Sequence, residues 1–156
     1  MRFPSREWCE AAASALLRDR TVIAAIADFG PVVAGIVITE CSAVPAPPAA
    51  GQARASWSAD FCVLARIEPG KPVKLSFPDD EDELEEFEPD YIGWAPYALC
   101  KSLLQQAQAG QRPDPLRAIL ERKVRLEGDL ERLVRHAGRH QGAGLDAIRS
   151  VPTEFV

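Results

Sequence analysis

The sequence predicts an α+β domain, in which helical segments at both ends of the chain flank a central group of strands. Apolar residues recur every three or four positions between residues 5 and 29, and again after residue 96. Between residues 32 and 77 the pattern changes to a β-branched run followed by alternation. The chain has 156 residues, so we expect one domain, 1–156, with a core of its own.

Composition and charge exclude several classes of protein. The net charge of -5 provides no positive field for a nucleic-acid partner. No apolar run approaches the ~20 residues of a membrane span, which predicts no stable membrane insertion. The first residues lack the apolar stretch of a secretory signal. The cysteines, Cys9, Cys41, Cys62 and Cys100, are widely spaced, which is typical of buried or free thiols in a reducing, cytoplasmic location. The alternative that the spacing leaves open is a disulfide.

The first half of the chain contains two predicted helices and then strands. Ser5 can cap the first helix, and Gly30-Pro31 ends the second. Residues 32–39 are rich in Val and Ile, as in a strand buried on both faces. A Pro/Ala-rich connection, residues 44–51, precedes a long alternating strand that ends at residue 67. A Pro-Gly turn at residues 68–71 then starts a hairpin whose second strand covers residues 73–77.

Residues 79–90 are strongly acidic, with nine Asp or Glu among twelve residues. We expect a solvated loop. The segment lacks the glycine and ligand spacing of a calcium-binding EF-hand loop. The alternative is a docking site, either for a basic partner protein or for the basic residues 112–140 of this chain.

The second half predicts the order strand, helix, helix, strand, helix, helix. A short strand at residues 91–94 leads to a helix that Pro96 can open. Asp114-Pro115 starts the next helix, because the carboxylate can cap it and proline suits its first position. Residues 123–127 alternate like a strand, and Gly128-Asp129 then turns the chain and caps a third helix. A last short helix precedes Pro152.

The sequence predicts no catalytic residue, no metal site and no cofactor. His136 and His140 stand four residues apart on a predicted helix, but no third zinc ligand accompanies them and arginines adjoin both. We therefore expect surface or helix-end histidines. The chain contains no G-x-S-x-G nucleophile motif and no glycine-rich nucleotide loop. These patterns favour a protein that is not an enzyme.

The stretch from Arg112 to residue 134 resembles the sterol carrier protein 2-like family, of the bacterial type. The resemblance rests on Asp114-Pro115, then Lys123, an apolar/charged alternation, Gly128-Asp129 and an apolar helix. Residues 3–8 and 151–156 also look like bacterial members. The Pro-rich segment 44–51 and the acidic segment 79–90 depart from the family pattern, and both could reshape the mouth of a cavity.

The resemblance implies a five-stranded, mostly antiparallel sheet with helices packed on one side. It also implies a tunnel between the sheet and the C-terminal helices, which would bind an apolar or amphipathic small molecule such as a lipid, fatty acid, acyl-CoA or sterol-like compound without catalysis. The candidate lining residues are Trp57, Phe61, Val63, Trp94, Leu103, Leu104, Ile119, Leu120, Leu126, Leu130, Leu133, Val134, Ile148 and Phe155. Any filled core would contain the same residues. The alternative is therefore an interaction or accessory module that acts through its acidic segment 79–90.

Overall fold

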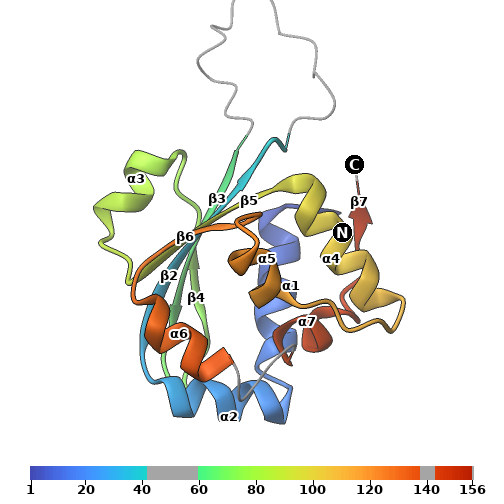
Figure 1. Ribbon diagram of the computed structural model, residues 1–156, viewed down its shortest axis with the longest axis horizontal. Helices are drawn as coiled ribbons and strands as arrows, with labels where there is room; N and C mark the ends of the chain where they lie inside the picture. The colour runs from blue at the N-terminus through green and yellow to red at the C-terminus, as the bar shows by residue number, and fades with distance from the viewer. Residues whose placement is uncertain (42–59, 138–142, 156) are drawn as a thin grey trace, which may run out of the picture.

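A twisted five-stranded sheet forms the centre of the protein (Figure 1). The computed structural model describes residues 1–41, 60–137 and 143–155. The sheet has the order β4-β3-β2-β5-β6, and only the β2–β5 pair is parallel among its neighbouring pairs. The predicted mostly antiparallel sheet is thus confirmed. Its strands are β2 (Val32–Thr39), β3 (Phe61–Ile67), β4 (Lys74–Ser76), β5 (Tyr91–Pro96) and β6 (Arg125–Glu127).

Helices from both ends of the chain lie on one side of this sheet, as expected (Figure 1). Beside them the two-residue strands β1 (Arg2–Phe3) and β7 (Glu154–Phe155) pair in parallel as a second, small sheet. None of the described helices is long and apolar enough to cross a membrane. The helices of this side are α1 (Arg6–Leu16), α2 (Arg20–Phe29), α4 (Tyr97–Gln108), α5 (Pro115–Leu120), α6 (Leu130–Ala137) and α7 (Ala143–Ile148).

The predicted capping residues set where several helices begin. The Ser5 hydroxyl accepts a hydrogen bond from the backbone N–H of Trp8 at 3.1 Å. The Asp114 carboxylate accepts one from the backbone N–H of Arg117 at 3.2 Å, with Pro115 at the first helical position. In the same way, Asp129 caps α6 through the backbone N–H of Arg132 at 3.1 Å.

The acidic segment corrects one prediction. Residues 81–86 form a helix, α3 (Glu81–Glu86), and not a solvated loop. Asp80 caps this helix through the backbone N–H of Glu83, and three acidic residues occupy its first turn, where the helix dipole favours negative charge. Figure 1 shows α3 on the other side of the sheet from the remaining helices. Its role as a docking site for a basic partner stays a prediction.

Two clusters of buried side chains lie on the two faces of the sheet. Successive residues of a strand point to opposite faces, so Val37 and Ile38 of β2 enter different clusters. The cluster on the helical side contains Phe3, Trp8, Ala12, Ile38, Tyr97, Leu104 and Val151. The cluster under α3 contains Val37, Cys62, Leu64, Leu84, Ile92 and Trp94.

Several predictions fall outside the described residues. These are the Pro-rich segment 44–51, residues 53–59 of the predicted long strand with Trp57, and His140. The described part of that strand, β3, follows the predicted alternation. Phe61 packs against the cluster on the helical side, and Cys62 and Leu64 lie in the cluster under α3.

Candidate ligand-binding cavity

An apolar cavity of about 510 Å³ lies between the helical face of the sheet and helices α2 and α6. We call it the sheet–helix cavity. Its volume falls within the range of roughly 300–1,000 Å³ that is usual for small-molecule sites. The lining residues are Val22, Ala25, Ile26, Phe29, Gly30, Val32, Ala34, Gly35, Ile36, Ile67, Tyr91, Gly93, Leu126, Leu133, His136 and Gly144.

The floor of the cavity comes from strands in the middle of the sheet. Ala34 and Ile36 point from β2 to this face, and Gly93 is paired with Ile36 on the neighbouring strand β5. Glycine and alanine leave room above the sheet, because a Cβ added at Gly93 would meet only Leu126, at 3.6 Å, and a backbone oxygen. The small side chains therefore hollow the floor where larger ones would fill it.

Ile36 shows that the described residues leave this space unfilled. It belongs to the central strand of the sheet, where a filled core would cover its side chain. Nevertheless 44% of its surface is exposed. Its neighbours in the same strand, Val37 and Ile38, are 0% and 6% exposed. The helices thus cover β2 at one end and leave an apolar hollow over Ile36.

One side of the cavity is formed by α2. Val22, Ile26 and Phe29 follow one another at helical spacing, and Ala25 lies on the same side. Asp19 caps this helix, and Gly30, with a φ of 87°, ends it in a conformation that suits glycine. The helix therefore presents one apolar face of fixed length to the sheet.

Few polar side chains among the described residues reach the cavity. Tyr91 contributes its ring, while its hydroxyl donates a hydrogen bond to the backbone carbonyl of Asp129 at 2.8 Å. Burial raises the pKa of Tyr91 above its usual value, and the Asp129 carboxylate raises it further. His136 is the titratable group contributed by α6, and its ring packs edge-on against Phe29. Among the described residues no group of three or more His, Cys, Asp or Glu could hold a metal ion.

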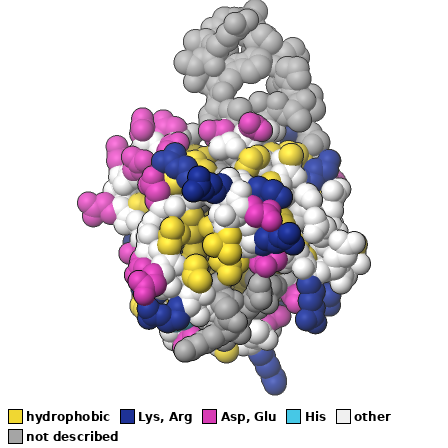
Figure 2. Space-filling model, viewed as in Figure 1, with side chains coloured by type: hydrophobic (Ala, Val, Ile, Leu, Met, Phe, Trp, Pro, Cys, Tyr) yellow, Lys and Arg dark blue, Asp and Glu magenta, His cyan; other side chains and the backbone are white. Residues whose placement is uncertain are grey.

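The structure places the residues predicted from the sequence at several distinct positions. Leu126 and Leu133 lie in the lining of the sheet–helix cavity. Leu120, Leu130 and Val134 are exposed on α5 and α6. In the space-filling view, hydrophobic side chains gather at the centre of one face, with charged side chains around them (Figure 2).

The other predicted residues are buried or half-buried and do not belong to this lining. Trp94 lies in the cluster under α3, on the opposite face of the sheet. Val63 is buried on β3 beside Ile36, while Leu103 and Ile119 are half-buried on α4 and α5. The residues that lie in or against the core cluster on the helical side are Phe61, Leu104, Ile148 and Phe155.

Sequence reasoning missed the contribution of α2 and β2. It assigned the wall to the C-terminal helices, although α2 shows an equally clear apolar stripe. A usable signal was present in the strands, where Gly35 and Gly93 stand at central positions. Glycine inside a strand often marks a place where another group approaches the sheet closely.

Comparison with known proteins shows the fold. The sequence matches no protein-family model and no curated protein. Among solved structures, it is similar to a conserved hypothetical protein of Thermus thermophilus that was suggested to be a sterol carrier protein. The identity is 18%, the TM-score is 0.61, and the similarity covers 96% of this chain and 90% of that one. It is also similar to sterol carrier protein 2, at 15% identity and a TM-score of 0.60, over 95% of this chain and 98% of that one. The chain therefore has the fold of sterol carrier protein 2.

Proposed function

We propose that this protein binds an apolar or amphipathic small molecule, of the lipid, fatty acid, acyl-CoA or sterol-like class, in the sheet–helix cavity and does not transform it. The observation that carries the proposal is the exposure of Ile36 on the central strand, in a hollow of about 510 Å³. A ligand in this hollow would remove the Ile36 side chain from water, which is favourable for both partners.

The fold and the chemistry of the lining support the same proposal. The sheet and helices are arranged as in sterol carrier protein 2, whose name describes a carrier. The lining consists mainly of aliphatic side chains, Phe29 and glycine backbone. Such a surface can bury hydrocarbon, as the mainly apolar lining of a small-molecule site does.

A pair of substitutions on α2 tests the proposal. Ala25 lines the cavity, whereas Ala24, the preceding residue, is exposed on the same helix. Ala25→Phe would place a ring in the hollow, and Ala24→Phe would place it in solvent. Both variants would be titrated with 1-anilinonaphthalene-8-sulfonate, and dodecanol and dodecanoate would then be used to displace it.

We expect the wild-type protein and Ala24→Phe to bind the dye alike, and Ala25→Phe to bind it at least about tenfold more weakly, a loss of about 1.4 kcal/mol. An organic extract of the purified full chain, examined by mass spectrometry, would identify any ligand retained from the cell. Equal binding by the two variants, or no binding of dye, alcohol or acid by the wild type, would refute the proposal.

A further inference from the structure

Helix α6 closes one side of the sheet–helix cavity without being part of either core cluster. Its Leu133 and His136 line the cavity. Neither buried cluster contains a described residue of α6. Its other two large apolar side chains, Leu130 and Val134, are 44% and 42% exposed. Little apolar burial therefore holds this helix against the rest of the protein, compared with the helices that enter the core.

Polar contacts at the end of α2 hold α6 in place instead. A guanidinium N–H of Arg132 donates a hydrogen bond to the backbone carbonyl of Phe29, the last residue of α2. The same guanidinium lies over the Phe29 ring, 4.3 Å from its centroid. Because α2 has no basic residue in its own last turn, Arg132 supplies the positive charge that the C-terminus of a helix favours.

His136 adds to this contact one turn further along α6. Its ring centroid lies 5.0 Å from that of Phe29, and its Nε2 is 3.7 Å from the Asp28 carboxylate. Its Nδ1 lies 3.0 Å from the backbone carbonyl of Arg132, which keeps the imidazole ring directed along the helix. Arg132 and His136 thus contact the last two residues of α2, Asp28 and Phe29, and we call these contacts the α2 latch.

The start of α6 is attached differently. The Tyr91 hydroxyl donates to the backbone carbonyl of Asp129 at 2.8 Å, which fixes this end to the sheet. The preceding residue, Gly128, has a φ of 134°, and a Cβ there would lie 2.6 Å from the backbone oxygen of Asp90. Glycine tolerates a change of φ that other residues do not. The chain can therefore turn at Gly128 while Tyr91 holds the point about which it turns.

We propose that α6 is the lid of the sheet–helix cavity, hinged at Gly128 and kept closed by the α2 latch. This inference rests on the proposed function, because it assigns the route by which a ligand enters and leaves. When the latch opens, Leu133 and His136 move away from the floor around Ile36 and the cavity becomes accessible. The latch then sets the rates of entry and exit, while the apolar lining sets the affinity.

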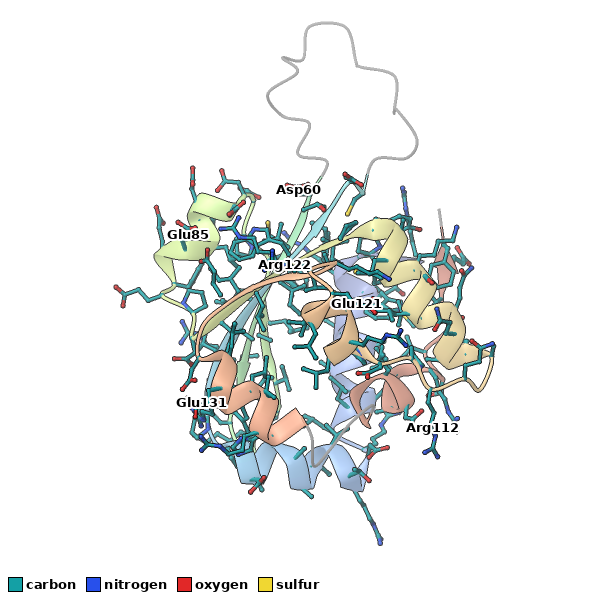
Figure 3. The ribbon with its side chains drawn as sticks, viewed as in Figure 1. Asp60, Glu85, Arg112, Glu121, Arg122 and Glu131 are labelled. Carbon is teal, nitrogen blue, oxygen red and sulfur yellow. The ribbon has the colours of Figure 1, made fainter. Side chains whose placement is uncertain are left out.

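Hydrogen exchange of the ligand-free protein tests the lid by itself. Arg132→Ala removes the main contact of the latch. Arg135→Ala is the matched control, because Arg135 pairs with Glu131 at 3.4 Å on the exposed side of the same helix. Figure 3 labels Glu131 on α6 at the edge of the molecule. Arg132→Lys retains the charge without the flat guanidinium and should fall between the two variants.

We expect exchange of the α6 amides to be about tenfold faster in Arg132→Ala than in wild type and unchanged in Arg135→Ala, because only the first variant should favour local opening. The amides of Val37 and Leu64 in the core of the sheet should keep their wild-type rates. Equal α6 exchange in the two variants, or faster exchange throughout the sheet in Arg132→Ala, would overturn the lid.

Stopped-flow binding of 1-anilinonaphthalene-8-sulfonate provides the second measurement. Arg132→Ala should raise the association and dissociation rates together, each by about the factor seen in exchange, so that Kd changes little. A higher Kd with an unchanged association rate would show that Arg132 holds the ligand and would contradict a lid. If the wild type does not bind the dye, the proposed function fails, whereas the exchange experiment still decides whether α6 opens.

Discussion

The acidic helix α3 should depend on one side chain, Leu84, for its attachment to the sheet. Leu84 is 0% exposed and is the buried residue of α3. Its methyl groups rest directly above Gly35 of β2, since a Cβ at that glycine would lie 2.9 Å from one of them. The substitution Leu84→Ala would remove this contact and leave a cavity over the cluster that contains Val37 and Trp94.

The expected cost follows from the burial. Replacing a buried leucine by alanine costs about 2–5 kcal/mol, depending on how far the site can collapse. A short surface helix can partly settle onto the sheet, so we expect a loss of about 3 kcal/mol in the free energy of unfolding. For a chain of this size, such a loss lowers Tm by about 6–12 °C.

Urea unfolding followed by circular dichroism and tryptophan fluorescence would measure this loss. Glu85→Ala is the control, because Glu85 is the next residue and is exposed on α3, where Figure 3 labels it. It should change stability by less than about 0.5 kcal/mol. Dye binding in the sheet–helix cavity should survive Leu84→Ala, because Leu84 packs on the opposite face of the sheet. A loss below about 1 kcal/mol in Leu84→Ala would refute the packing described for α3.

Three further predictions concern the cavity, the sheet and the thiols. In calorimetric titrations with a series of 1-alkanols, the affinity should rise about fourfold for each added CH₂ until the cavity is full, which corresponds to about 0.8 kcal/mol per CH₂. An affinity that did not depend on chain length would contradict an apolar binding site. The alanine of Gly93→Ala has room beside Leu126, so this variant should raise the free energy of unfolding by about 0.4–1 kcal/mol. The alanine of Gly35→Ala would collide with Leu84, so that variant should lower it by about 1–3 kcal/mol. Denaturant unfolding that gave the reverse order of stability would contradict the description of the cavity floor. Burial raises the thiol pKa from 9.0 to about 12 at Cys9 and to about 11 at Cys41, Cys62 and Cys100. Above about pH 9 the folded state therefore retains thiol protons that the unfolded state releases. The contribution of the buried thiols to the free energy of unfolding should therefore be fully present below about pH 9 and should decrease as pH rises toward 11. A free energy of unfolding that stayed level or rose over this interval would contradict the burial of Cys9, Cys41, Cys62 and Cys100.

Most helices and strands could be predicted because their signals are local. Asp114-Pro115 and Gly128-Asp129 carry their own start signals, and α5, β6 and α6 follow them as expected. The run of Val and Ile in residues 32–39 likewise coincides with β2. In each case, the residues that determine the element are neighbours in the sequence.

The acidic helix was missed although it has a local signal. Asp80 and Glu83 stand at the spacing of a capping box: Asp80 accepts from the backbone N–H of Glu83, and Glu83 accepts from that of Asp79. The high density of acidic residues favoured the prediction of a loop instead, because an acidic run is usually solvated. The packing of Leu84 against Gly35, about fifty residues earlier in the chain, attaches the segment to the sheet.

The cavity could not be predicted because it depends on distances between elements. Apolar stripes on α2 and α6 are equally consistent with a filled core and with a hollow one. The difference lies in how far those helices stand from β2, and the contacts between Arg132 and Phe29 contribute to that spacing. A tertiary contact between residues about one hundred positions apart does not change the local hydrophobic pattern of the sequence, so the pattern cannot predict it.

The pairing of β1 with β7 has a consequence for folding during synthesis. Phe3 lies beside Phe155 in that small sheet, and the same buried cluster contains Trp8 and Val151. Helix α1 thus packs against residues that leave the ribosome more than one hundred positions later. Until then Phe3 and Trp8 lack part of their burial, so this segment should be protected only after the residues around Phe155 have been synthesised. Contacts of such long sequence separation slow folding, and an aggregation-prone interval should accompany translation of this chain.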